Sequence, residues 1–135
     1  MRYAFGACLL AAGLTACAVT TDMPDPDEGA RLFVENCALC HGNDARGTGE
    51  IAAGLQPPPA DLTRIAARND GAFPRAQVMS AIDGYTRMEP GEEMPEFGLL
   101  LRGPTVPVEL GDDGALTPVP RPLAALMIYL ESIQR

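Results

Sequence analysis

The sequence predicts a small all-α domain in which the first and last helices cross. Asp25 can cap a helix in which Pro26 takes the first position and Glu28 stands three residues after the cap. A second helix is predicted from about Pro122 to residue 135, because its apolar side chains recur at helical spacing. These side chains are Leu123, Leu126, Met127, Leu130 and Ile133. Gly29 costs ~1 kcal/mol inside a helix unless close packing requires it, so we expect the two helices to cross there.

The first helix leads into a five-residue motif, Cys37-Ala38-Leu39-Cys40-His41. Cys-x-x-Cys-His is the attachment signature of a c-type haem, and its two-residue spacer places the sulfurs about one helical turn apart. Each thiol can add to one vinyl group of the porphyrin. His41 then lies under the iron and supplies an imidazole nitrogen as the proximal ligand. The predicted cofactor is one haem c, with its iron, per chain.

Two other uses of the cysteine pair fit the sequence less well. A zinc ribbon needs a second Cys/His pair, but His41 is the only histidine, and Cys8 and Cys17 lie in an apolar N-terminal stretch. A thioredoxin-like redox pair should follow a strand and open a helix, whereas this pair ends a helical pattern. Haem attachment is therefore the preferred interpretation, with a structural zinc module as its rival for the metal.

Residues 1–17 are predicted to be an export signal. Arg2 precedes an apolar stretch that is too short to span a bilayer as a normal helix. The sequence Leu14-Thr15-Ala16-Cys17 resembles a bacterial lipobox, so Cys17 is the expected lipid attachment site and the protein would be anchored at the periplasmic side of a bacterial membrane. An ordinary signal, leaving a soluble periplasmic protein, is the alternative. Residues 18–26 are then a linker, and residues 27–135 form the folded domain.

The charge of the chain bears on its partners. It has 18 acidic residues against 10 basic ones, all of them arginine, for a formal net charge of −8. An acidic chain without a basic cluster argues against nucleic-acid binding. A charged redox partner should instead present a basic docking patch.

Two longer patterns resemble class I cytochrome c. One is the run Gly29-x-x-x-Phe33-x-x-x-Cys37-x-x-Cys40-His41, and the other is the terminal Leu126-x-x-Tyr129-Leu130. The resemblance covers residues 27–98 and 122–135. It implies the cytochrome c fold, in which crossed terminal helices surround one covalently bound haem. Gly29 and Phe33 would then meet Leu126 and Tyr129.

The proline-rich segment 57–63 is also similar to bacterial members of that family. A ligating imidazole needs its second N–H bonded to a carbonyl or carboxylate, and the resemblance implies the carbonyl of Pro58 or Pro59. We favour Pro59. Leu62 is expected to pack on a haem face, and Asp61 to cap a short helix through residue 68.

The sixth iron ligand must come from a side chain other than histidine. A methionine thioether suits low-spin iron and raises its reduction potential. Met94-Pro95-x-Phe97-Gly98 resembles the distal-ligand segment of the family, so Met94 is preferred, and Met88 is its rival. Met79 belongs to a helix predicted over residues 74–83 and is expected in the core.

Residues 99–121 lie outside the resemblance. Residues 106–110 and 115–119 flank Asp113-Gly114, a hairpin turn signal, so we expect a small hairpin insert before the last helix. It could cover a haem edge, dock a partner or be a passive loop.

These features predict a one-electron carrier rather than an enzyme. Two strong iron ligands leave no open coordination site, and the redox partner would be an exported or membrane protein. The alternative is a gas- or peroxide-binding sensor or enzyme subunit with a displaceable sixth ligand. A peroxidase is disfavoured, because no distal histidine exists in the chain.

Overall fold

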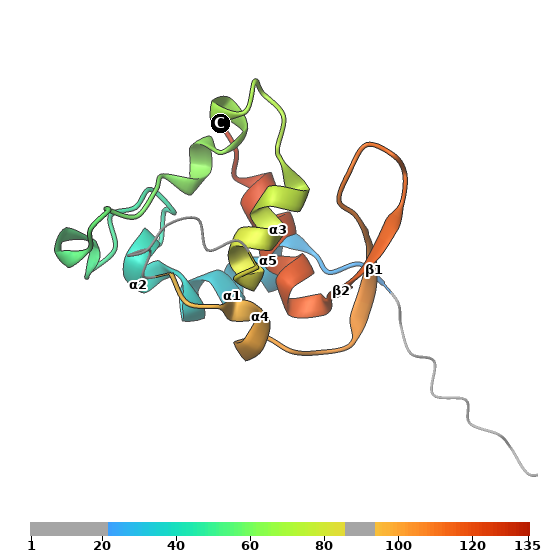
Figure 1. The fold of residues 1–135 in the computed structure, drawn as a ribbon. Coiled ribbons are helices and arrows are strands. Elements are labelled where there is room, and N and C mark those ends of the chain that lie inside the picture. The colour runs from blue at the N-terminus through green and yellow to red at the C-terminus, as the bar shows by residue number, and fades with distance from the viewer. Residues whose placement is uncertain (1–21, 86–93) are drawn as a thin grey trace, which may run out of the picture.

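Figure 1 shows the computed structural model, which describes residues 22–85 and 94–135. Helix α1 spans Pro26–Asn36, one residue inside the predicted linker, and Asp25 caps it by accepting from the N–H of Glu28 at 2.7 Å. The N–H of Cys37 donates to the Phe33 carbonyl at 2.8 Å and ends the helix. The short helix α2, Ala38–His41, follows directly. The chain therefore delivers the Cys-x-x-Cys-His motif on one turn at the end of α1.

Helix α5, Arg121–Ser132, crosses α1 as predicted. A Cβ atom on Gly29 would stand 2.0 Å from the Ala125 carbonyl oxygen and 2.6 Å from the Tyr129 Cβ. The rings of Phe33 and Tyr129 pack with their centroids 5.3 Å apart. Gly29 thus lets the two backbones approach at Ala125 and Tyr129.

Helix α3, Arg75–Asp83, packs on α5, and α4, Phe97–Leu100, packs on α3. Gly84 ends α3 with a φ of 92°, the left-handed conformation expected of a C-terminal glycine. Three 3₁₀ turns connect the motif to α3, and they are η1 (Ala52–Gly54), η2 (Leu62–Arg64) and η3 (Ala66–Arg68). The short helix predicted after Asp61 is therefore two 3₁₀ turns. Asp61 does cap the first, accepting from the Thr63 N–H at 2.9 Å.

The insert before α5 is an antiparallel hairpin. Strand β1, Thr105–Glu109, pairs with β2, Leu116–Pro120, in a register that sets Val106 opposite Val119. Its buried side chains are Val106, Val108 and Val119, and both strands contact α5. Figure 1 shows the hairpin on the far side of α5 from α2. The predicted hairpin is confirmed, with a longer loop between its strands.

The core lies where these elements meet, and its most deeply buried large side chains are Phe33, Leu123, Leu126, Met127 and Val108. Two ion pairs join α5 to the helices that pack on it. Arg121 on α5 pairs with Glu28 on α1 at 2.8 Å, and Arg75 on α3 pairs with Glu131 on α5 at 2.7 Å. Within residues 22–85 and 94–135, no helix has the length and apolar character needed to cross a membrane.

Candidate functional site

An apolar cavity lies between α1, α3 and α5 and opens beside the Cys-x-x-Cys-His turn. Its mouth is open, and the ≈ 530 Å³ of space free of atoms at this site includes open solvent. Within the described ranges, the residues that line it are Phe33, Cys37, His41, Leu62, Ile65, Val78, Ala81, Ile82, Met94, Leu126 and Leu130. Cys37, His41, Leu62 and Met94 therefore border one space.

The cysteine motif forms a tight turn at the wall of this cavity. The N–H groups of Cys40 and His41 donate to the Cys37 carbonyl at 3.2 and 2.9 Å. Both cysteines are free and half-buried. Cys37 lines the cavity, and Cys40 is not among the described residues that line it. Burial, helped by the neighbouring Cys40, raises the pKa of the Cys37 thiol to about 11.

His41 lies on the same wall, and a backbone carbonyl orients its ring. Its Nδ1 stands 3.2 Å from the carbonyl oxygen of Ala60. Burial lowers the pKa of His41 more than this carbonyl raises it, which favours the neutral imidazole. With the proton on Nδ1 and donated to Ala60, Nε2 keeps the free electron pair that a metal ligand needs.

The acceptor for His41 differs by one residue from the prediction. Pro59 was expected to accept this hydrogen bond, but the structure gives the role to Ala60. The Pro59 carbonyl faces Gly47 instead, where a Cβ atom would stand only 2.2 Å from its oxygen. The proline-rich segment therefore does supply the acceptor for His41, but from Ala60, one residue after Pro59.

A glycine-rich loop supports the motif from outside, and the sequence did not reveal this role. Gly47 donates to the His41 carbonyl at 2.8 Å, and Gly49 to the Cys40 carbonyl at 3.0 Å. A Cβ atom on Gly49 would stand 2.3 Å from the Leu39 carbonyl oxygen, so the loop can approach only as glycine. These bonds satisfy the carbonyls that α2 leaves open at its end. Glycine spacing after the motif was the available signal.

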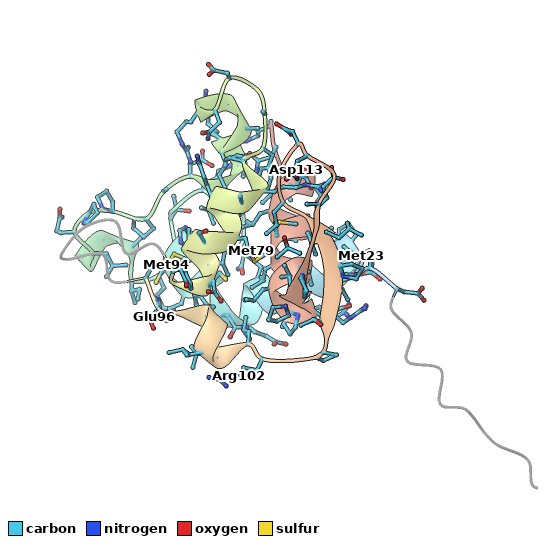
Figure 2. The ribbon with its side chains drawn as sticks, turned by 45° about the vertical axis from the view of Figure 1, so that its right-hand side comes forward. Met23, Met79, Met94, Glu96, Arg102 and Asp113 are labelled. Carbon is cyan, nitrogen blue, oxygen red and sulfur yellow. The ribbon has the colours of Figure 1, made fainter. Side chains whose placement is uncertain are left out.

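The sequence offers Met94 and Met88 as candidate iron ligands and Met79 as a core residue. Met94 lines the cavity and is 45% exposed, and Figure 2 shows it beside α3. Met79 is buried in the core, as predicted. Met88 lies outside the described residues, as does Cys17. The structure thus brings Met94 to the cavity that His41 lines and leaves the comparison with Met88 open to experiment.

The donors and the lining fit a haem. Carbon surfaces make almost the whole wall, and among the described residues that line it only His41, Met94 and Cys37 carry a heteroatom in the side chain. In the described part of the chain, no three His, Cys, Asp or Glu side chains gather as a structural zinc site would require. A zinc module therefore finds no support among these residues.

Comparison with known proteins decides the family. The family model described as cytochrome c oxidase, cbb3-type, subunit III matches residues 24–101, more than half of the chain. The chain belongs to this family of c-type cytochromes. The match confirms haem c with its iron as the cofactor, and it supports the cytochrome c fold, here helical with one small two-stranded sheet.

One curated relative is a cbb3-type cytochrome c oxidase subunit, FixPc, of Rhizobium leguminosarum bv. viciae. It is 40% identical over 60 residues, which are 42% of this chain and 20% of the relative. The match therefore spans about a fifth of that protein. No solved structure matches the chain.

Proposed function

We propose that this chain of the cbb3 cytochrome family carries single electrons through one haem c bound in the cavity between α1, α3 and α5. The observation that carries the proposal is that Cys37, His41 and Met94 line the same apolar cavity. Cys37 and Cys40 would hold the haem by thioether bonds. His41 and Met94 would be the protein ligands of the iron.

When bound, the haem supplies an iron centre that gains and loses one electron. The chain's own residues set the conditions for that exchange. The Ala60 carbonyl orients the His41 ring and favours the tautomer with its proton on Nδ1, and Leu62, Ile65 and Leu126 line the cavity and would help to exclude water from a bound haem. A thioether from Met94 would favour the reduced state, because it is a soft neutral ligand. Two protein ligands leave no site for a substrate, so the chain would be an electron-transfer component and not a catalytic one.

The partner we propose is a membrane oxidase of the cbb3 kind, since both the family and the relative carry that description. The net charge of −8 favours a partner surface rich in basic residues. We place the domain, residues 27–135, on the periplasmic side of a bacterial membrane. Residues 1–17 would be the signal and residues 18–26 the linker, with Cys17 as the lipid attachment site.

Carbon monoxide added to the reduced holoprotein at neutral pH tests the carrier against the sensor. A carrier with both axial positions filled should keep its visible spectrum and also pass electrons to a cbb3-type oxidase. The exposure of Met94, at 45%, makes a displaceable ligand the alternative to consider. Rapid and complete binding of carbon monoxide would favour the gas- or peroxide-binding sensor and contradict the carrier.

A further inference from the structure

The segment that carries the Ala60 carbonyl also forms part of the cavity wall. Ala60 accepts from His41 Nδ1 at 3.2 Å, and Leu62 and Ile65 line the cavity a few residues later. On one side the segment is tied to the loop after the motif, because the Leu62 N–H donates to the Ala45 carbonyl at 2.8 Å. Its position therefore sets both the His41 hydrogen bond and one wall of the cavity.

Its other attachment comes from the residues that follow α5. The Gln134 side chain donates from Nε2 to the Leu62 carbonyl at 2.8 Å and accepts at Oε1 from the Ala66 N–H at 2.9 Å. One amide thus bridges both sides of turn η2, across 72 and 68 residues of sequence. In Figure 1 the chain after α5 ends beside the turns that carry these residues.

The orientation of the Gln134 amide is dictated by its neighbours. Nε2 also donates to the Leu130 carbonyl at 2.6 Å, so it meets two acceptors while Oε1 meets one donor. The reversed amide would place an oxygen against two carbonyl oxygens. The bridge therefore needs a side chain that donates and accepts at this length, as glutamine does.

Arg135 adds a second attachment to the same turn. Its N–H donates to the Thr63 carbonyl at 3.1 Å, and its Nε donates to the Thr63 hydroxyl at 2.8 Å. Thr63 is 5% exposed, and its hydroxyl donates a hydrogen bond to Asp61 Oδ1 at 2.6 Å. Residues 61–66 are thus held by the segment after α5, and α5 itself lines the cavity through Leu126 and Leu130.

We propose that Gln134 is a positioning residue for the haem iron, because it holds segment 60–66 and keeps the Ala60 carbonyl on His41. This rests on the proposed ligation by His41. A carbonyl on Nδ1 raises the basicity of a ligating imidazole, and a more basic ligand favours oxidised iron. Loosening the segment should therefore raise the reduction potential and weaken the bond from His41 to the iron.

The test uses the holoprotein with Gln134→Met, which keeps the side-chain length and removes both hydrogen-bonding groups. Gln77→Met is the matched control, because Gln77 is exposed on α3. Removing a direct outer partner of a metal ligand typically changes affinity about 10- to 100-fold. Gln134 acts one step further out, so we expect acid release of His41 to become about 3- to 10-fold easier. The midpoint of the acid transition in the visible spectrum should then rise by about half to one pH unit, and the potential should rise with it.

Thr63→Val provides a second route to the same segment without changing charge, and it should shift both quantities in the same direction by less. A role in stability alone would lower the unfolding midpoint and leave the potential and the acid midpoint where the control has them, which overturns the proposal. If wild-type holoprotein shows no histidine-ligated iron at all, the proposed site fails, and this inference fails with it.

Discussion

At the scale of the residue, Met94 is the side chain that decides which chemistry the cavity supports. It lines the cavity that His41 also lines, and its thioether would complete the coordination of the iron. Met94→Leu keeps most of the packing, at a cost below about 1.5 kcal/mol, but removes the ligand. We predict that the iron of this variant becomes high-spin and binds carbon monoxide when reduced, as visible spectra would show. Its reduction potential should fall, as a redox titration would show.

Met23 provides the control for that change. It is 44% exposed against 45% for Met94, and Figure 2 places the two on opposite sides of the molecule. Met23→Leu should leave the spectrum and the potential unchanged. If Met88→Leu turns the iron high-spin while Met94→Leu does not, the ligand is Met88 and the assignment of Met94 is wrong.

Asp61 should make the stability contributed by segment 60–66 depend on pH. The Thr63 hydroxyl donates to its Oδ1 at 2.6 Å and the Thr63 N–H at 2.9 Å. Chiefly through the hydroxyl bond, with help from the N–H and from Arg135 and Arg46, the pKa of Asp61 lies below its ordinary value. A carboxyl group whose pKa is lower in the folded state stabilises the fold above its unfolded pKa. That contribution disappears as the pH falls through the folded pKa.

We therefore predict that Asp61→Asn lowers the free energy of unfolding by a constant amount from neutral pH down to about pH 4. This limit is the ordinary pKa of an Asp side chain in the unfolded chain. The difference from wild type should then shrink in more acidic solution, in denaturant titrations run at a series of pH values. Asp113→Asn is the control, because Asp113 accepts an equivalent bond from the Ala115 N–H at the hairpin tip. A difference for Asp61→Asn that stays constant down to pH 3 would contradict this account.

At the scale of the element, the crossing of α1 and α5 depends on the absence of a side chain at Gly29. A Cβ atom there would stand 2.0 Å from the Ala125 carbonyl oxygen, a backbone atom that can move only if the helices separate. We predict that Gly29→Ala lowers the free energy of unfolding by about 1–3 kcal/mol, measured by denaturant unfolding of the holoprotein.

Gly54→Ala is the matched substitution for Gly29→Ala. No atom lies within 4 Å of a Cβ at Gly54, and alanine reduces the freedom of the unfolded chain, so stability should stay equal or rise by up to about 1 kcal/mol. Equal losses in the two variants would mean that close packing at the crossing is not the reason for Gly29.

Most elements could be predicted from local signals. Asp25 with Pro26 specified the start of α1, Gly84 the end of α3, and Asp113-Gly114 the hairpin. Each of these acts through bonds or dihedral angles within a few residues, so the sequence alone shows them. The predicted apolar stripe similarly identified Leu123, Leu126, Met127 and Leu130, which are buried, whereas Ile133 lies just past the end of α5 and is half-buried.

The remaining features depend on contacts between distant parts of the chain. Whether Pro59 or Ala60 faces His41 is set by how the loop at Gly47 packs on the proline segment. The bridge from Gln134 to Leu62 joins residues 72 positions apart. No local pattern distinguishes such a glutamine from an exposed one, so neither the acceptor's identity nor the bridge could be predicted.

At the scale of the whole molecule, the hairpin insert belongs to the architecture of the core. Val106, Val108 and Val119 are buried, and both strands contact α5. Arg75 joins the parts together, because it pairs with Glu131 on α5 and donates to the Glu109 carbonyl at 3.3 Å. Among the described residues, no hairpin side chain lines the cavity. The described part of the hairpin therefore packs on the core and not on the cavity wall, and its possible role at a haem edge or in docking a partner stays a prediction.

The position of the whole domain relative to a membrane depends on Cys17 in the proposal. With Cys17→Ser, export would still occur but no lipid could be added, so the protein should move from the membrane fraction to the soluble periplasmic fraction. Fractionation followed by haem staining measures this directly. Cys8→Ser is the control, since Cys8 would leave with the signal. An unchanged distribution for Cys17→Ser would mean that the lipid anchor is wrong.

The central claim is that Cys37 and Cys40 bind a haem covalently at the wall of one apolar cavity, and the most direct measurement is the intact mass of the exported protein after denaturation in acid. The account predicts that the wild type retains its colour and the added mass of one haem, and that a Cys37→Ala and Cys40→Ala double variant has neither. A wild-type chain that comes out of the acid colourless, at the mass of its polypeptide, would contradict the account.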